Sequence, residues 1–236
     1  MVMIKSRIYE IVPERDLPKL NDRVLRLPQW RRRKALSYLH AIDRLQCALA
    51  YELLEDLLSE AFGVRLSDHE ILYDPMGKPS LSDHPGIHIT LSHSPTAVIA
   101  AVADHPIGCD IETIPPLSSI KREGINPSAL PMKEFADIMD YCYSQGERRI
   151  VAESLNPMSQ FTELWTLKES IFKIDNSFDI EVLDTVSIQG FIRRTIFGNS
   201  FVATVAAPIK YTSSIPQIHE CTHSNNEMDE KTIPCI

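Results

Sequence analysis

The sequence lacks the features that mark membrane-spanning and exported proteins. It has no run of about 18 apolar residues, the length at which a segment becomes a candidate membrane-spanning helix. Its amino terminus reads Met-Val-Met-Ile-Lys-Ser-Arg-Ile, with charges where a signal peptide would keep an apolar core. We therefore expect a protein that is neither secreted nor inserted into a membrane.

The cysteine patterns of disulfide scaffolds and zinc sites are also missing. The five cysteines are odd in number, and no two of them are spaced as CxxC. This usage is typical of the reducing cytosol and predicts a cytoplasmic protein. An excess of positive charge is absent too, because 24 Lys and Arg residues stand against 32 Asp and Glu residues, for a net charge of -8. The charge balance disfavours general nucleic-acid binding.

What remains is the composition of an ordinary globular protein. A chain of 236 residues can form one large domain or two small ones with substantial cores. The contents of 44% hydrophobic and 24% charged residues fit that class. No internal repeat is visible.

Hydrophobic periodicity predicts a mixture of helices and strands. Between residues 41 and 58, apolar residues recur at three- and four-residue steps, which predicts an amphipathic helix with a buried stripe. Residues 97–103 are apolar throughout, as a strand covered on both faces would be. Further strands are predicted over 7–12, 87–92, 107–112, 178–186, 188–196 and 200–206, and further helices after 27–28 and over 132–143 and 156–174. We expect a loop over 114–131, a turn at 144–147, and a poorly ordered tail from residue 216.

One predicted strand carries two acids on the same face. Alternation over residues 107–112 turns Ile107, Cys109 and Ile111 to one side, and Asp110 and Glu112 to the other. Neighbouring carboxylates repel each other unless a cation lies between them, and oxygen ligands without His or Cys suit Mg²⁺ better than Zn²⁺. Gly108 is expected to leave the approach to this face open. Such a pair is often only solvated, so a metal site requires a third acid.

The helix predicted over 156–174 supplies that acid. Trp165, Glu169 and Lys173 are spaced by four and share a face distinct from the buried stripe. An ordinary surface ion pair between Glu169 and Lys173 is the alternative interpretation. The tryptophan on the same face argues against it, because a purely solvated face does not require one.

Basic residues occur at two places earlier in the chain. Trp30 is followed by four consecutive cations, from Arg31 to Lys34, which form either a solvated helix face or a cradle for a phosphate. Lys78 lies in the turn Asp74-Pro-Met-Gly-Lys-Pro79, before the strand that leads to Ser92 and His93. A loop lysine is usually solvated, so Lys78 alone indicates little.

Four of these stretches together resemble the 4′-phosphopantetheinyl transferases, specifically the long, surfactin-synthetase-activating type. Residues 107–112 match the family's Gly-aliphatic-Asp-x-Glu motif, and 164–173 match its Trp-x-x-Lys-Glu-x-x-x-Lys motif. Gly77-Lys-Pro79 and Leu91-Ser-His-Ser94 match two more, in the expected order. The resemblance covers about residues 30–201 and is poor over 115–156.

The resemblance implies an α+β fold made of two similar two-layer α/β halves. In the family, a pseudo-twofold relates the halves within one monomeric chain, and coenzyme A binds between them. For this chain it implies an N-terminal half over 1–105, a C-terminal half over 106–215, and a flexible tail over 216–236.

The implied activity is transfer of the phosphopantetheine arm from coenzyme A to a serine of an acyl or peptidyl carrier protein, with Mg²⁺ or alternatively Mn²⁺, releasing adenosine 3′,5′-bisphosphate. The resemblance implies Asp110, Glu112 and Glu169 as metal ligands, Glu169 and Lys173 as catalytic residues, and Arg31, Lys34, Lys78, Ser92, His93 and Lys168 as residues that bind coenzyme A. Trp165 and Lys168 would also shape the site.

Two other functions stay open at this stage. A module that binds coenzyme A or a carrier protein without catalysis would use the same surfaces. A Mg²⁺-dependent phosphohydrolase of small nucleotides would use the same acids and lysines. The sequence leaves the carrier protein's pathway open among fatty-acid, polyketide and nonribosomal peptide synthesis.

Overall fold

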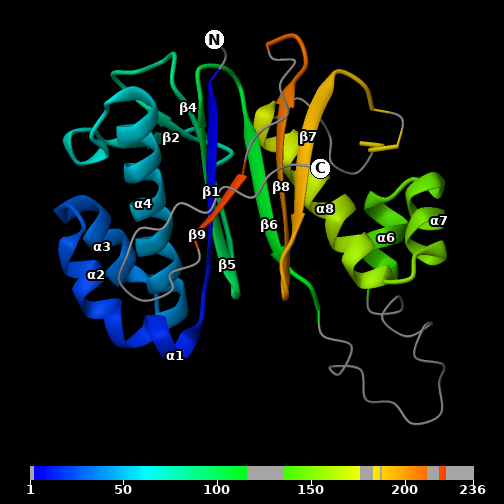
Figure 1. Cartoon of the computed structure of the whole chain (residues 1–236), viewed down its shortest axis with the longest axis horizontal. Helices are drawn as coiled ribbons and strands as arrows, with labels where there is room; N and C mark the ends of the chain where they lie inside the picture. The colour runs from blue at the N-terminus through cyan, green and yellow to red at the C-terminus, as the bar shows by residue number, and fades with distance from the viewer. Residues whose placement is uncertain (1–2, 116–134, 176–182, 187, 212–217, 222–236) are drawn as a thin grey trace.

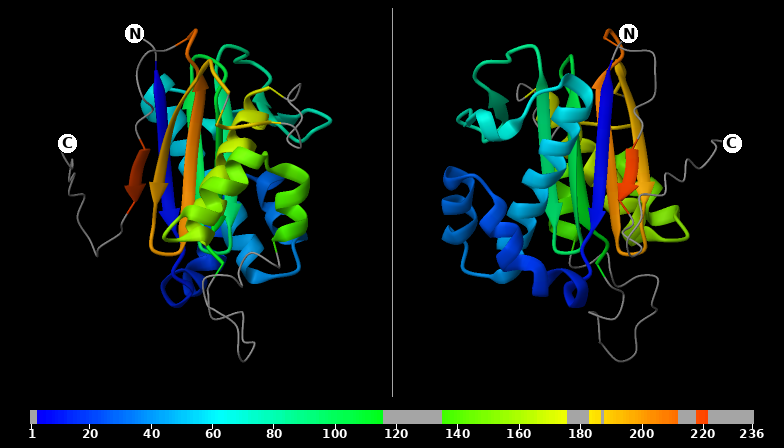
Figure 2. Two further views of the ribbon diagram at one scale, coloured as in Figure 1. Left: turned by 90° about the vertical axis from the view of Figure 1, so that its right-hand side faces the viewer. Right: turned by 60° about the vertical axis from the view of Figure 1, so that its left-hand side comes forward.

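A computed structural model describes residues 3–115, 135–175, 183–186, 188–211 and 218–221 of the chain. Two sheets lie face to face at the centre, and helices cover the outer side of each (Figure 1). The rotated views show the same order, with α8 in front in one view and α4 in front in the other (Figure 2). The predicted α+β fold is confirmed, and each half has one helical layer on one sheet.

The N-terminal half supplies five strands of a mixed sheet with the order β2-β3-β4-β5-β1-β9, and β9 (Ile218–Cys221) comes from the end of the described chain. Its strands are β1 (Ile4–Glu10), β2 (Ile71–Tyr73), β3 (Pro79–Leu81), β4 (His88–Ser94) and β5 (Ala97–Ala103). Its helices are α1 (Pro13–Asp16), α2 (Leu20–Arg26), α3 (Gln29–Ser37) and α4 (Ala41–Phe62), with 3-10 turns η1 (Leu17–Lys19) and η2 (Leu66–Asp68). Helix α4 ends at Gly63, whose φ of 66° is the left-handed conformation that favours glycine. The stripe predicted on this helix is buried from Leu45 to Leu57.

The C-terminal half is a three-stranded antiparallel sheet with the order β6-β8-β7. It consists of β6 (Gly108–Thr113), α6 (Ala136–Cys142), α7 (Gln145–Glu153), α8 (Pro157–Ile174), β7 (Phe191–Phe197) and β8 (Phe201–Pro208). Helix α8 begins as predicted, because Asn156 Oδ1 accepts a hydrogen bond from the amide of Ser159 at 3.2 Å and Pro157 occupies the first helical position.

Strand β5 lies between the helices of one half and the sheet of the other. All of its residues are fully buried, as the uninterrupted apolar run predicts. Alternate residues from Val98 pack into the core beneath α4, and those from Ile99 pack against the second sheet. That second core includes Ile107, Cys109 and Ile111, so the predicted apolar face of β6 is confirmed.

The opposite face of β6 is covered by α8, contrary to the expectation for Gly108. A Cβ atom added to Gly108 would lie 1.9 Å from the carbonyl oxygen of Ser170 on α8. The glycine therefore lets the helix approach the strand and does not open a path to the acids. The sequence prediction is wrong here, because an alternating pattern identifies a face but not what covers it.

Other predictions need correction at segment level. Residues 144–147 are the start of α7 instead of a turn, since Ser144 and Glu147 form a reciprocal capping box. Residues 183–186 of the strand predicted over 178–186 are not extended, and 178–182 lie outside the described residues. Part of the predicted tail is ordered as strand β9 (Ile218–Cys221), which pairs in parallel with β1. The rest of the tail, most of the loop over 114–131, and residues 132–134 of the helix predicted over 132–143 are likewise outside the description.

Both halves combine one long helix with a sheet, α4 in the first and α8 in the second. The pseudo-twofold relation between them stays a prediction. Among the described residues, no helix is long and apolar enough to cross a membrane.

Candidate active site

Three segments far apart in sequence converge on the carboxylate of Asp110. Ser92 Oγ on β4 donates a hydrogen bond to Asp110 Oδ1 at 2.7 Å. Lys173 Nζ on α8 donates to the same oxygen at 2.6 Å and lies 3.2 Å from Ser92 Oγ. The structure therefore brings together residues from three of the four motifs that the sequence analysis singled out.

The second oxygen of Asp110 has no partner among the described residues. Asp110 is only 2% exposed, and its Oδ2 atom is buried without a hydrogen bond from any described residue. A buried carboxylate oxygen left unpaired costs about 1–3 kcal/mol or more, because it has lost its water and gained no donor. A bound cation would satisfy this atom, and the oxygen ligands nearby are those that Mg²⁺ prefers.

Glu112 and Glu169 complete an acidic cluster with Asp110. Both are half-buried, and no described residue donates a hydrogen bond to either carboxylate. Burial, followed by the charges of Asp110 and Glu169, raises the pKa of Glu112 to about 7. Burial and the charge of Asp110 raise the pKa of Glu169 as well. The three carboxylates are thus close enough to repel one another. Carboxylates that share one cation repel one another in the same way when the cation is absent.

The acids are not drawn together around a common point. Among the described residues, no three His, Cys, Asp or Glu side chains are grouped closely enough to hold a metal ion. Lys173 instead supplies the positive charge at Asp110, and it forms no ion pair with Glu169 among these residues. Burial lowers the pKa of Lys173, but Asp110 outweighs this effect and the pKa is raised. The i,i+4 ion pair that the spacing permits is therefore not formed.

Trp165 lies on α8, the helix that carries Glu169 and Lys173. It is partly buried and packs with the hydrophobic cluster of α6, α7 and α8 that contains Tyr143 and Phe161. The tryptophan thus anchors α8 against its neighbouring helices, which a solvated helix face would not need.

Arg31 lies buried in the N-terminal half without an acidic partner. It is 7% exposed, and its Nη atoms donate to the Tyr73 hydroxyl at 3.2 Å and to the Cys47 carbonyl at 3.4 Å. In the part of the chain that the structure describes, its Nε atom has no hydrogen-bond partner and no carboxylate forms an ion pair with it. A buried guanidinium bonded only to neutral oxygens favours a bound anion.

Two further predicted residues lie near Arg31. The charges of Arg31 and Lys34 both act on the Cys47 thiol, opposing the rise in its pKa that burial causes. His93 is exposed, yet desolvation of its ring and the charges of Lys173 and Arg31 lower its pKa. His93 is therefore near enough to feel the charges of Arg31 on α3 and of Lys173 and Asp110 at the acidic cluster.

Lys78 reaches the C-terminal end of α8. The predicted turn is formed, because Asp74 Oδ1 accepts from the amides of Met76 and Lys78 and Gly77 has a φ of 85°. Lys78 Nζ donates to the carbonyl oxygen of Ile174 at 2.7 Å. Burial lowers its pKa despite the nearby charge of Asp74.

Lys168 does not join the other predicted site residues. It is 1% exposed, and its Nζ atom pairs with Glu147 Oε2 on α7 at 3.0 Å and also contacts the carbonyl oxygen of Leu183. Glu147 is not among the predicted site residues, although the Ser-x-x-Glu spacing of a capping box is visible in the sequence at Ser144.

A cavity of about 700 Å³ lies at the C-terminal end of α8. It is lined by Pro106, Ile174, Asp175, Gln189, Gly190, Phe191, Pro208, Ile209, Lys210 and Tyr211. None of the predicted site residues is among them, so this cavity and the acidic cluster differ in their lining.

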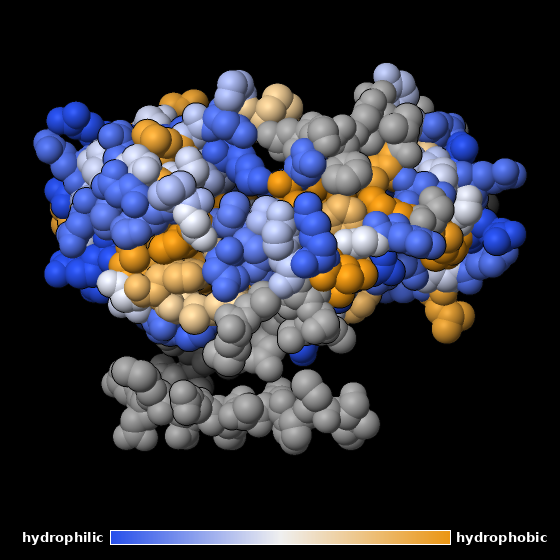
Figure 3. Space-filling model, turned by 90° about the horizontal axis from the view of Figure 1, so that it is seen from above, coloured by the Kyte–Doolittle hydropathy of each residue, from blue (hydrophilic) through white to orange (hydrophobic). Residues whose placement is uncertain are grey.

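The face of the molecule seen from above carries hydrophobic patches, in orange, interspersed with hydrophilic ones, in blue (Figure 3).

Comparison with known proteins points to one family. Residues 106–196 match the family model described as the 4′-phosphopantetheinyl transferase superfamily. The chain is 27% identical over 185 residues to the 4′-phosphopantetheinyl transferase ffp of Bacillus subtilis, covering 78% of this chain and 76% of that protein. It is 26% identical over 186 residues to the 4′-phosphopantetheinyl transferase Sfp of Bacillus subtilis strain 168, with the same coverage. The matched region holds the acidic cluster and Lys173, and over more than three quarters of its length the chain is similar to Sfp-like 4′-phosphopantetheinyl transferases.

Proposed function

We propose that the protein transfers the 4′-phosphopantetheine arm of coenzyme A to a serine hydroxyl of an acyl or peptidyl carrier protein. The serine oxygen forms a bond to the phosphorus that carries the arm, and the bond from that phosphorus to the bridging oxygen breaks. The products are the holo carrier and adenosine 3′,5′-bisphosphate. The convergence of Ser92, Asp110 and Lys173 beside two further carboxylates carries this proposal.

Asp110, Glu112 and Glu169 are the proposed ligands of Mg²⁺, with Mn²⁺ as an alternative. The unpaired Oδ2 atom of Asp110 and the mutual repulsion of the acids support this assignment. When bound, the ion supplies positive charge to the pyrophosphate of coenzyme A.

Glu169 is the proposed acceptor of the serine proton. Its carboxylate is not engaged by any described hydrogen-bond donor, so an oxygen atom is left to accept the proton. The proton passes from the serine hydroxyl to this carboxylate, directly or through one water molecule.

Lys173 is the proposed partner of the leaving phosphate. Its pKa is raised, so the side chain carries a positive charge at neutral pH. An ammonium held in place before the reaction stabilises developing negative charge without rearrangement.

The remaining basic and polar residues would hold coenzyme A. Arg31 and Lys34 suit its 3′-phosphate, because Arg31 is buried without a counter-ion. Lys78, Ser92 and His93 suit the pyrophosphate. Coenzyme A would then lie between the half over 1–105 and the half over 106–215. The monomeric state and the cytoplasmic location stay predictions.

Intact-mass spectrometry of an apo carrier protein tests this function. After incubation with coenzyme A and Mg²⁺, we expect the carrier to gain the mass of the phosphopantetheine arm. Chelation with EDTA should stop the reaction and added Mg²⁺ should restore it. Consumption of coenzyme A without carrier modification would indicate a phosphohydrolase. Binding of coenzyme A with neither change would indicate a non-catalytic binding module.

A further inference from the structure

Glu147 connects three segments on the side of α8 that faces α7. Its Oε2 atom lies 3.0 Å from Lys168 Nζ, and the two side chains are 0% and 1% exposed. The same oxygen accepts a hydrogen bond from the amide of Ser144 at 2.8 Å. The Oε1 atom accepts from the amide of Thr185 at 2.9 Å and from the Thr185 hydroxyl. One buried carboxylate thus joins the start of α7, the segment 183–185 and α8.

Lys168 directly precedes Glu169, the proposed base. Its ammonium is held by Glu147 and the carbonyl of Leu183, and it lies 5.4 Å from the centre of the Tyr143 ring. Successive residues of a helix point about 100° apart, the rotation set by 3.6 residues per turn. Holding Lys168 on the α7 side therefore fixes the direction in which Glu169 leaves the helix.

Ser170 holds the helix on the other side of Glu169. Its hydroxyl lies 2.7 Å from the carbonyl oxygen of Thr166 and 3.0 Å from that of Thr204 on β8. Its own carbonyl abuts Gly108 on β6. Glu169 is thus flanked by two buried residues, one anchored to α7 and one to the sheet.

Stability alone does not account for the buried pair of Glu147 and Lys168. Removing two charges from water is costly, and replacing a buried ion pair by well-packed hydrophobic residues of similar volume is often neutral or stabilising. Its distinct contribution is geometric, since two charged groups with several hydrogen bonds define one orientation of the helix.

We propose that Glu147 is a positioning residue for phosphopantetheine transfer: through Lys168, it sets the orientation of Glu169 toward the Asp110 cluster. This inference rests on the proposed function, so the wild-type protein must first modify a carrier protein in the same assay. A wild-type protein without transfer activity would overturn the proposed function. If the wild type is active and the Glu147 variants have the same kcat as the wild type, only this inference is overturned.

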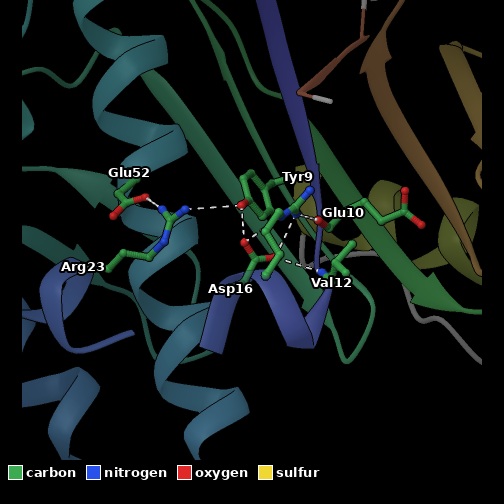
Figure 4. Close-up of polar contacts among 7 residues, drawn as sticks. Tyr9, Glu10, Val12, Asp16, Arg23 and Glu52 are labelled. Carbon is green, nitrogen blue, oxygen red and sulfur yellow. Dashed lines mark hydrogen bonds and ion pairs between the residues drawn. The ribbon is translucent and has the colours of Figure 1, made fainter. Parts of the chain in front are cut away.

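The experiment compares the variants Glu147→Gln and Glu147→Gln/Lys168→Met with a matched control. The double variant has no buried charge at the pair, so it should recover the stability that the single variant loses. Asp16→Asn is the control, because Asp16 is also a fully buried carboxylate with several donors, located in the N-terminal half (Figure 4). Tyr9 Oη donates to it at 2.6 Å, and the amide of Val12 at 2.9 Å. Rates are measured well below the melting temperature of each variant.

We expect kcat to fall at least about tenfold in both Glu147 variants, because a misplacement of about 1 Å can cost as much as 10²-fold. The KM for coenzyme A should stay within about twofold in Glu147→Gln, since this variant leaves every residue assigned to coenzyme A in place. Asp16→Asn should lower the melting temperature and leave kcat unchanged. The proposal is overturned if the double variant regains wild-type kcat along with its stability, or if Asp16→Asn loses as much kcat as Glu147→Gln.

Discussion

Lys173 Nζ and Asp110 Oδ1 lie 2.6 Å apart, although the residues are 63 positions apart in the chain. The ammonium occupies one oxygen of the carboxylate, and the other oxygen, Oδ2, has no partner among the described residues. In the proposed metal site, Asp110 would bind the cation at Oδ2 and keep its lysine at Oδ1. The pair places the proposed metal ligand and the proposed phosphate partner in contact before any substrate arrives.

The first prediction follows from this contact. Asp110→Ala should lower the transfer rate by about 10²-fold or more, because it removes a metal ligand and the partner that orients Lys173. It should also lower the free energy of unfolding by about 1–3 kcal/mol, since Lys173 and Ser92 lose a buried acceptor. Intact-mass kinetics and urea denaturation measure the two effects.

The expected loss in the free energy of unfolding differs from what a surface acid would show. By its sequence pattern, Asp110 lies on an open face and its removal relieves repulsion, whereas the structure buries it to 2% exposure. A variant with wild-type transfer rates would place the metal site elsewhere.

The second prediction tests whether Glu169 and Lys173 are catalytic residues or an ordinary surface ion pair. Glu169→Gln and Lys173→Met should each lower kcat by about 10²-fold or more, because they remove the proton acceptor and the charge at the leaving phosphate. The double variant should lose less than the product of the two single losses, since both groups act on one transition state. A surface ion pair would change stability by well under about 1 kcal/mol and leave rates alone. Thermal melts alongside the rates decide between the two, and near-wild-type kcat in both single variants would refute the catalytic assignment.

Periodicity could predict the elements whose burial is decided locally. The stripe on α4, the apolar run of β5 and the Asn-Pro start of α8 are readable from spacing and turn chemistry alone. Motif resemblance could predict that Ser92, Asp110 and Lys173 belong to one site. Neither signal depends on knowing the other half of the molecule.

The errors concern what lies across each face. The strand pattern around Gly108 predicts an opening because it contains no information on α8, which covers this glycine. The motif around Lys168 groups this lysine with the residues that bind coenzyme A, but the helix turns it toward Glu147. Such relations depend on long-range packing and cannot be derived from local spacing.

The third prediction concerns the buried guanidinium of Arg31. Arg31→Gln should raise the KM for coenzyme A about tenfold, because a charge-assisted hydrogen bond contributes about 1.5–3 kcal/mol. With 3′-dephospho-coenzyme A as substrate, the variant and the wild type should have the same KM. Arg33→Gln is the control, since Arg33 lies exposed on the same helix. An equal rise in KM for both substrates would show that Arg31 does not bind the 3′-phosphate.

The fourth prediction tests the contact between β6 and α8. Gly108→Ala should lower the free energy of unfolding by about 1–3 kcal/mol or more, because overpacking forces the backbone apart. The added Cβ would meet the carbonyl oxygen of Ser170, so α8 must shift and the transfer rate should fall as well. Gly86→Ala is the control, since a Cβ added there would have no neighbouring atom within 4 Å. Equal urea midpoints for the two variants would mean that β6 and α8 are less closely packed than described.

The fifth prediction concerns the pH dependence of stability. Arg15, Tyr9 and the amide of Val12 donate hydrogen bonds to Asp16, and together they outweigh its burial and lower the pKa of this carboxyl in the folded protein. A carboxyl with a lowered folded pKa binds fewer protons in the folded state than in the unfolded state. Its stabilisation is therefore complete above its unfolded pKa of about 3.9 and is lost as the pH falls through the folded pKa.

The comparison of wild type with Asp16→Asn isolates this group, because the other carboxylates titrate in both proteins. Urea denaturation should show the largest difference in unfolding free energy near neutral pH, where the Asp16 carboxylate is charged in both states. The difference should shrink only below about pH 4, as protons bind first to the unfolded chain. A difference that stays constant down to the acid transition would mean that the hydrogen bonds around Asp16 do not depend on its charge. The network of Tyr9, Arg15 and Asp16 would then stabilise α1 through hydrogen bonds and packing that do not depend on the charge of Asp16.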